Sequence, residues 1–216
     1  KRRHVYLTAA ELYAVAEGAK WRRDIVLTLG LCGMRWGELA ALRVRDVDLE
    51  RHRLHIGASA STVAGRVVVS DTKTYASRSV MYPEMLDGMM RHRCEGRGDD
   101  DLLFDAPHRP GDYLSNADGP TSPDGWFAVA LRRAGIDKGH MTVHDLRHTA
   151  ASLMVSAGAN VKAVQRQLGH RSAAMTLDTY ADLFDDDLDD LSAAMSDMLA
   201  REHVGKTWAE RDEVGE

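Results

Sequence analysis

Three short runs of β-forming residues lie in the middle of a chain whose flanking regions have the pattern of helices. The runs are Arg53 to Ile56, Arg66 to Ser70 and Arg78 to Tyr82, and turn-forming residues separate them. Ile25 to Met34, before them, has the apolar content of a buried helix that stops near Gly33. We therefore expect a mainly α domain of the α+β class, with one small antiparallel β-sheet inserted among the helices.

The remaining segments extend this helical prediction. Thr8 to Glu11 is a capping box that opens a helix, and Arg35 to Arg43 and Pro83 to Cys94 are predicted as further helices. Glu95 to Pro123 contains four of the five prolines and is predicted to be surface loop. After Asp124 the pattern is helical almost to the end, with glycine-rich breaks. No internal repeat or second core is visible, so we expect a single domain.

The composition is that of a globular protein, with 44% apolar and 28% charged residues. No apolar stretch reaches the roughly 20 residues that a membrane helix needs, and no export signal is evident. Cys32 and Cys94 are the only cysteines, and we expect both to be free thiols in the cytoplasm.

The charge is distributed unevenly along the chain. Residues 1–177 contain 25 Lys and Arg against 20 Asp and Glu, whereas residues 178–216 contain 3 against 13. A polyanion would meet the mildly basic body rather than the acidic tail. The tail could face a protein surface or solvent, or it could simply aid solubility.

The segment from His144 to His148 allows two chemical interpretations. His144 and His148 are spaced i, i+4, which is the spacing of a helical zinc site. Asp145 replaces the longer glutamate of the usual zinc motif, and Arg147 would place a positive charge beside the metal. Alternatively, His144 and Arg147 at i, i+3 can both donate hydrogen bonds to one phosphate oxygen. We favour the phosphate interpretation.

Arg35 is a second candidate phosphate anchor. It lies between two predicted helices, with Gly33 and Gly37 on either side, and Glu38 can hold its guanidinium. The alternative is that Arg35 only caps a helix and forms a structural ion pair with Glu38.

Further along the chain, Leu168-Gly169-His170 ends a predicted helix and Tyr180 follows ten residues later. The order of these basic residues and the tyrosine along the chain resembles that in the catalytic domain of the tyrosine recombinases, the phage-integrase family. The resemblance extends from about Thr8 to about Ala200. The segment from Asp71 to Val80 resembles the β-hairpin of that family whose turn carries a catalytic lysine, here Lys73. The implied catalytic residues are Arg35, Lys73, His144, Arg147, His170 and Tyr180.

The chemistry of phosphodiester cleavage assigns a task to each of these residues. Tyr180 would be the nucleophile, Arg35 and Arg147 would neutralise the pentavalent phosphorane, and His170 would add a hydrogen bond. His144 is the candidate general base and Lys73 the candidate general acid for the leaving 5′-hydroxyl. Glu38 would orient Arg35. We interpret His148 as a packing or hydrogen-bonding residue.

The resemblance also implies the organisation and the partners. Residues 1–200 would form the catalytic domain and 201–216 an acidic tail, and we expect the N-terminal DNA-binding domain of the family to be absent from this chain. The expected substrate is double-stranded DNA. The enzyme would cut and rejoin it through a 3′-phosphotyrosyl intermediate, without a metal, a nucleotide or another cofactor. The amphipathic pattern from Leu183 to Leu199 could join protomers in a homotetramer or cap its own core.

Accessory DNA-bending proteins and association with the nucleoid are further implications of the resemblance. Two alternatives remain open: a type IB topoisomerase, which would use nearly the same residues, and a zinc hydrolase built on His144 and His148.

Overall fold

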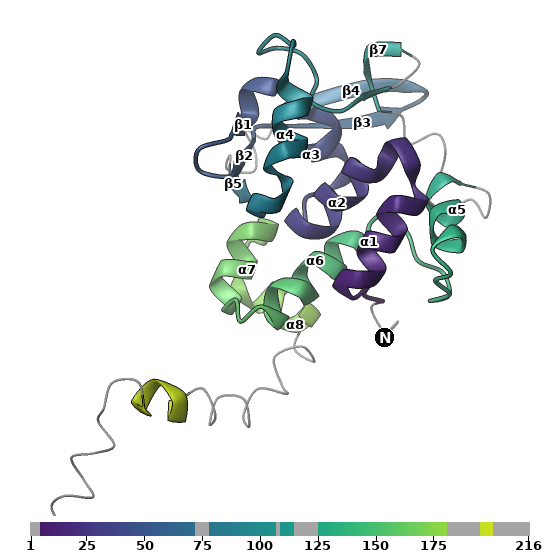
Figure 1. Cartoon of the computed structure of the whole chain (residues 1–216). Coiled ribbons are helices and arrows are strands. Elements are labelled where there is room, and N and C mark those ends of the chain that lie inside the picture. The colour runs from purple at the N-terminus through teal and green to yellow at the C-terminus, as the bar shows by residue number, and fades with distance from the viewer. Residues whose placement is uncertain (1–4, 72–77, 107–108, 115–124, 181–194, 201–216) are drawn as a thin grey trace, which may run out of the picture.

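Helices form most of the structure, and short strands lie together in its upper part in the view of Figure 1. The computed structural model describes residues 5–71, 78–106, 109–114, 125–180 and 195–200. The helices, including short 3-10 helices labelled η, are α1 (Ala9–Gly18), η1 (Lys20–Arg22), α2 (Arg23–Cys32), α3 (Trp36–Ala41), η2 (Val44–Asp46), η4 (Glu84–Leu86), α4 (Asp87–Cys94), α5 (Trp126–Arg133), α6 (Asp145–Ser156), α7 (Val161–Leu168) and α8 (Ala173–Tyr180). The strands are β1 (Val47–Asp48), β2 (Arg53–Ile56), β3 (Ala58–Val63), β4 (Arg66–Asp71), β5 (Arg78–Met81), β6 (Asp105–Ala106) and β7 (Arg109–Tyr113). The prediction of a mainly α domain with a small amount of antiparallel sheet is confirmed.

Helix α2 lies at the centre of the main core, between α1 and α6. The capping box predicted at Thr8 and Glu11 is present at the start of α1. The two helices α1 and α2 approach closely at Gly30, where an added Cβ would lie 2.4 Å from the Leu12 side chain. Helix α2 ends at Gly33, which has a φ of +70°, so that the chain turns directly into the segment that carries Arg35.

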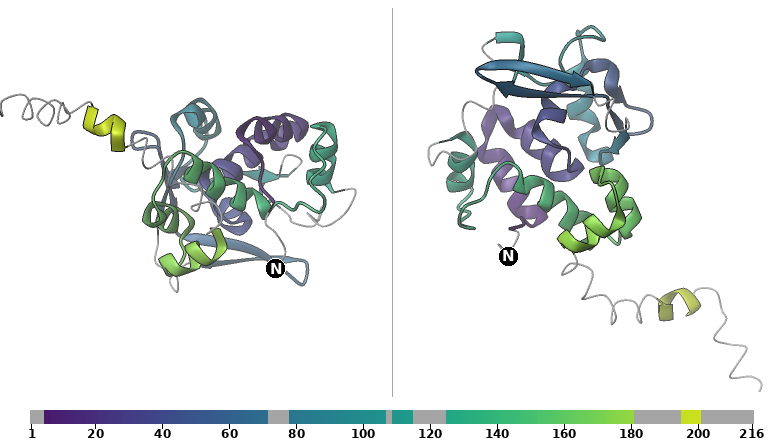
Figure 2. Two further views of the ribbon diagram at one scale, coloured as in Figure 1. Left: turned by 90° about the horizontal axis from the view of Figure 1, so that it is seen from below. Right: turned by 180° about the vertical axis from the view of Figure 1, so that it is seen from behind.

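The prediction of one small sheet is wrong in its topology. The described strands form three separate antiparallel sheets, with the orders β1-β2-β5, β3-β4 and β6-β7. Strand β3 was missed because its sequence, Ala-Ser-Ala-Ser-Thr-Val, has little of the apolar content that indicates a strand. Strand β4 pairs with β3, and β5 pairs with β2. Residues 72–77, which include the turn of the hairpin expected from Asp71 to Val80, lie outside the described residues. Figure 2 shows the long β3–β4 hairpin against one side of the helices.

The segment from Glu95 to Pro123 is not entirely surface loop as predicted. Leu102, Leu103 and Phe104 are buried, and the strands β6 and β7 follow them. Strand β7 contains Pro110 and Gly111, which are poor strand formers, and this explains why the sequence did not reveal it.

A second, smaller apolar cluster joins α6, α7 and α8. It contains Ala151, Val164, Leu168 and Tyr180, all nearly inaccessible to solvent. This cluster fixes the end of α8 against α6, and so places the predicted nucleophile beside the helix that carries Arg147. Residues 195–200 form a further helical segment in which Met195 is exposed.

Both cysteines are free, as predicted. Within the described ranges, no helix combines the length and the apolar character needed to cross a bilayer.

Candidate active site

Arg35 precedes the first turn of α3 and is held there by Glu38. The Glu38 carboxylate accepts hydrogen bonds from the Arg35 backbone N–H at 2.8 Å and from its Nη1 at 3.0 Å. Half of the Arg35 side-chain surface remains exposed, whereas Glu38 is only 4% exposed. The start of α3 therefore fixes the backbone of Arg35 and leaves its guanidinium accessible.

Glu38 is also bound by Arg78, a residue that the sequence analysis did not single out. Arg78 Nη1 and Nη2 donate to the two carboxylate oxygens at 2.9 and 2.8 Å, in a bidentate pair. Burial raises the pKa of Glu38, but the hydrogen bonds and charge of Arg78, together with Arg35, outweigh burial and lower the pKa below its usual value. Glu38 is thus an ionised link between two arginines.

Arg147 is buried in α6 and connects two other segments of the site. Its Nη1 donates to the Gly33 carbonyl at 2.6 Å, and its Nη2 donates to the Leu168 carbonyl at 2.7 Å. Burial, and then the positive charge of Arg35, lower its pKa to about 10, so the guanidinium stays charged at neutral pH. These two bonds engage only two of its five N–H groups.

His170 follows the glycine that ends α7. Its Nδ1 lies 2.9 Å from the Thr176 hydroxyl, and its ring stacks on the Tyr180 ring with centroids 6.3 Å apart. Burial lowers its pKa to about 4, and the charges of Arg147, Arg35 and Arg78 act in the same direction. His170 is therefore neutral at pH 7 and lies within the electrostatic reach of all three arginines.

Tyr180 ends α8 and is only 1% exposed. Its hydroxyl lies 2.9 Å from His148 Nδ1. Burial raises the pKa of Tyr180 to about 12, although the charge of Arg147 opposes this effect. The Tyr180 hydroxyl is thus protonated at neutral pH, and the His148 imidazole is within hydrogen-bonding distance of its oxygen.

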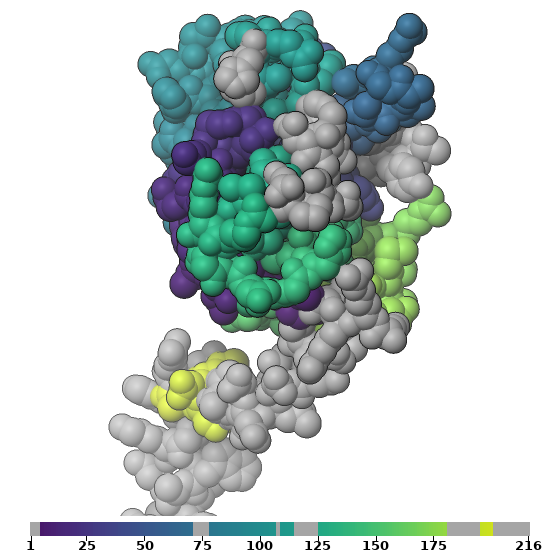
Figure 3. All heavy atoms as spheres, turned by 90° about the vertical axis from the view of Figure 1, so that its right-hand side faces the viewer, coloured from purple at the N-terminus to yellow at the C-terminus, as the bar shows by residue number. Residues whose placement is uncertain are grey.

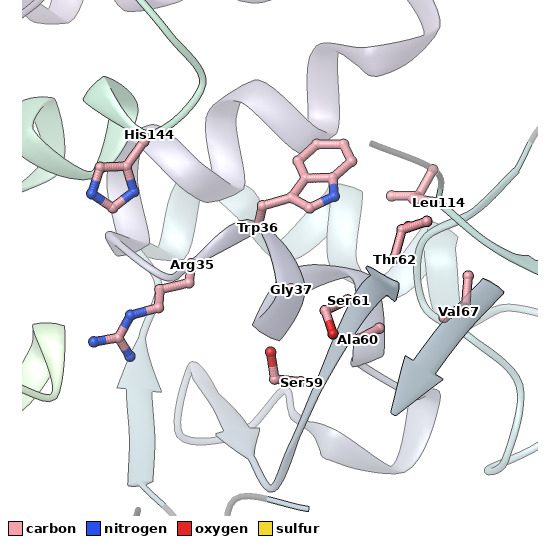
Figure 4. A pocket seen from close by; sticks show the side chains of 10 residues that line it. All are labelled: Arg35, Trp36, Gly37, Ser59, Ala60, Ser61, Thr62, Val67, Leu114 and His144. Carbon is pink, nitrogen blue, oxygen red and sulfur yellow. The ribbon is translucent and has the colours of Figure 1, made fainter. Parts of the chain in front are cut away.

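His144 and His148 are in contact with each other at the start of α6. Their ring centroids are 5.4 Å apart and the rings are nearly perpendicular. His144 also lines a cleft of about 610 Å³, here called the Arg35 cleft (Figure 4). The cleft is lined by Arg35, Trp36, Gly37, Ser59, Ala60, Ser61, Thr62, Val67, Leu114 and His144. The histidine pair therefore extends from the Tyr180 hydroxyl to the cleft beside Arg35.

Gln167 fixes the relative positions of three segments around the site. Its side-chain amide donates to the carbonyls of Cys32 and Met81 at 3.0 and 2.7 Å, and its Oε1 accepts from the Met81 N–H at 2.9 Å. Gln167 thereby links the end of α2, strand β5 and the end of α7, which are far apart in the sequence.

The structure brings together five of the six predicted catalytic residues and the predicted supporting residue Glu38. Lys73 lies outside the described residues. Sequence reasoning missed Arg78 and Gln167, and it did not show that the hydrogen-bonding partner of His148 is Tyr180 itself. An arginine and a glutamine of this kind carry no local signal, because their partners are 40 to 135 residues away.

The zinc interpretation gains no support from this geometry. Within the described part of the chain, no group of three or more His, Cys, Asp or Glu side chains is arranged to hold a metal ion.

The comparison with known protein families agrees with this arrangement. The sequence model of the phage integrase family matches residues 7–186. The chain belongs to the phage integrase family. Members with similar sequences include the integrase of Mycobacterium phage D29, which is 31% identical over 182 residues, covering 79% of this chain and 46% of the phage protein. The tyrosine recombinase XerA of Thermococcus kodakarensis is 32% identical over 158 residues, covering 71% of this chain and 48% of XerA. The chain thus spans less than half the length of either relative.

Solved structures of an integrase and of a recombinase share the fold. The Tn1549 transposon integrase in complex with circular intermediate DNA matches with a TM-score of 0.72 and 21% identity, over 88% of this chain and 68% of that one. A crystal structure of XerA recombinase matches with a TM-score of 0.61 and 25% identity, over 94% of this chain and 66% of that one. The predicted fold of a tyrosine recombinase catalytic domain is confirmed.

Proposed function

We propose that this chain is the catalytic domain of a site-specific DNA recombinase that cuts and rejoins DNA through a 3′-phosphotyrosyl intermediate. The observation that carries the proposal is the convergence of Arg35, Arg147, His170 and Tyr180, which come from four different segments. The solved Tn1549 integrase structures contain DNA, and membership of the same family supports double-stranded DNA as the substrate here.

In the first step, the Tyr180 oxygen attacks the scissile phosphorus and the 5′-oxygen of the next nucleotide leaves. A bond from the phosphorus to the tyrosine replaces the bond to the 5′-oxygen, so the bond energy is kept for rejoining. Because Tyr180 has a pKa of about 12 in this state, its proton must be accepted as the new bond forms. His148 Nδ1 can accept that proton from the hydroxyl, and His144, the general base expected from the sequence, has its ring against that of His148.

The arginines neutralise the charge that develops on the phosphorane. Arg35 is accessible, and Arg147 is fixed by two backbone carbonyls, so that its other N–H groups can point at a phosphate oxygen. The neutral His170 donates a further hydrogen bond. Arg78 and Glu38 hold Arg35 in place, and Lys73 supplies the proton to the leaving 5′-oxygen. Each of these tasks is met by a side chain of the protein, so the proposed route needs no metal or cofactor.

Assembly is proposed through the C-terminal segment. Met195, Met198 and Leu199 are 42 to 51% exposed in the described part of this segment, as expected of a helix that packs on a neighbouring protomer in a tetramer. Accessory DNA-bending proteins would help to bring two sites together, and the enzyme would act on DNA in the cytoplasm, at the nucleoid.

The test is the trapping of covalent protein–DNA adducts on a pool of nicked duplexes with randomised sequence. We expect the wild-type chain to form an adduct that survives denaturing gel electrophoresis, with or without a metal chelator, and the Tyr180→Phe variant to form none. Tyr82→Phe is the matched control, because Tyr82 is equally buried and its ring contacts that of His52 instead of a candidate catalytic residue. A Tyr180→Phe variant that still formed the adduct would contradict the proposal. A requirement for two paired sites would separate a recombinase from a type IB topoisomerase.

A further inference from the structure

The Arg35 cleft has two chemically different ends. Figure 4 shows Arg35 and His144 on one side of the cleft and Leu114 and Val67 on the other. The first end is basic, and the second presents methyl groups. A nucleotide has a similar order of groups, from an anionic phosphate through the sugar to a base whose flat faces can pack against apolar side chains. The volume of about 610 Å³ is in the range of sites that bind molecules of this size.

Trp36 occupies the middle of the cleft and is held in a fixed position. It is the first residue of α3 and immediately follows Arg35 in the chain. Its ring packs against that of Trp126, with centroids 6.3 Å apart and an angle of 35° between the planes. An indole that is supported in this way can act as a flat platform for a nucleobase.

The opposite wall of the cleft belongs to the β3–β4 hairpin. Its position is set at Gly37, where an added Cβ would lie only 2.5 Å from the Ala60 carbonyl oxygen. In Figure 3 the blue segment that contains this hairpin stands out from the body at the upper right. The hairpin contributes Ser61, Thr62 and Val67 to the lining of the cleft. The charged residues of the hairpin are Arg66, next to its turn, and Asp71, at the far end of β4.

We propose that the Arg35 cleft binds an unpaired nucleotide next to the scissile phosphate, with its base against Trp36. The proposal rests on the proposed function, which places that phosphate at Arg35. A base inside a duplex is stacked between its neighbours, so only an unstacked base can lie flat on an indole. Strand exchange creates such bases, because the cleaved strand must leave its complement before its 5′-hydroxyl can attack a second phosphotyrosine. Stacking on Trp36 offsets part of the cost of unpairing.

The test compares the binding of two probes by fluorescence anisotropy, a 12-nucleotide oligothymidylate and a blunt 20-base-pair duplex of mixed sequence. We expect Trp36→Leu to weaken oligothymidylate binding by about tenfold, the effect typical of one lost base–aromatic stack. Duplex binding should stay within about twofold, because phosphate contacts dominate it. Trp36→Phe should retain most of the oligothymidylate affinity. Trp21→Leu, which removes an exposed indole outside the cleft, should change neither.

A second pair of variants keeps the test valid if Trp36→Leu does not fold. Val67 and Val68 are adjacent on β4, are 40% and 47% exposed, and point to opposite faces of the hairpin. Only Val67 lines the cleft. We expect Val67→Asp to weaken oligothymidylate binding at least fivefold more than Val68→Asp does, about the effect of one misplaced charge.

The proposal would be overturned if Val67→Asp and Val68→Asp weakened oligothymidylate binding equally. It would also be overturned if Trp36→Leu weakened the binding of the oligothymidylate and of the duplex equally. The adduct assay of the wild-type chain separates this failure from failure of the proposed function. An adduct without any dependence of oligothymidylate binding on Trp36 contradicts the cleft alone. Trp36-dependent binding without an adduct contradicts the phosphotyrosyl mechanism instead.

Discussion

Glu38→Gln is the substitution that most directly tests how the arginines are held. The carboxylate accepts four hydrogen bonds, two from Arg35 and two from Arg78, and is almost fully buried. Arg35 is half exposed and can be rehydrated, whereas Arg78 is only 17% exposed. The loss is therefore dominated by one buried guanidinium without its counter-charge, and we expect about 3 kcal/mol of lost stability. For a chain of this size this corresponds to a fall in Tm of about 6–12 °C.

The pH dependence of this loss has a definite sign. The folded-state pKa of Glu38 lies below its unfolded value, so its ionisation stabilises the fold at pH values above the unfolded pKa. This contribution disappears as the pH falls through the folded-state pKa. Urea unfolding of wild type and Glu38→Gln should therefore show a large difference at pH 7 that shrinks at acid pH, and the exposed Glu84→Gln should show neither effect. A difference that is absent at pH 7, or that does not change with pH, would refute the reasoning.

Glu38→Gln should also slow adduct formation, since a catalytic group displaced by about 1 Å can cost about 10²-fold in rate. The measurement is the rate of adduct formation at a temperature well below the Tm of the variant. An unchanged rate would mean that Arg35 does not depend on Glu38 for its position.

Three further outcomes follow from the same contacts. Gly169→Ala should lower the Tm in thermal unfolding more than Gly158→Ala does. Both glycines have a positive φ, which costs about 1–2 kcal/mol for alanine. Only at Gly169 would the new Cβ also lie 2.8 Å from Arg78 Nε. His170 has a pKa of about 4 in the folded state, so between about pH 6.5 and pH 4 it binds a proton in the unfolded state but not in the folded state. The free energy of unfolding should therefore decrease as the pH falls through this range, and His170→Gln should flatten this part of the stability profile. Removal of the residues from Asp186 onward should weaken assembly, measured by light scattering on DNA, without unfolding the domain; unfolding would mean that the segment caps its own core.

Local chemistry explains which parts of the fold the sequence revealed. The capping box at Thr8 and the helix stop at Gly33 depend on residues within one helical turn, and both predictions are confirmed. Strand β3 depends on its pairing with β4 rather than on its own composition, and it was missed. The same limit applies to the site: the residue types and their order were visible, whereas the bidentate pair of Arg78 with Glu38 and the three bonds of Gln167 exist only in the folded chain.

In the proposed mechanism, one phenol oxygen attacks a phosphorus atom held by Arg35 and Arg147. The most direct measurement is mass-spectrometric peptide mapping of the protein–DNA adduct, with the DNA strands labelled at either end. We expect that, of the six tyrosines in the chain, only Tyr180 carries DNA, and that the linkage is to a 3′-phosphate. An adduct on another tyrosine, or one linked to a 5′-phosphate, would contradict it.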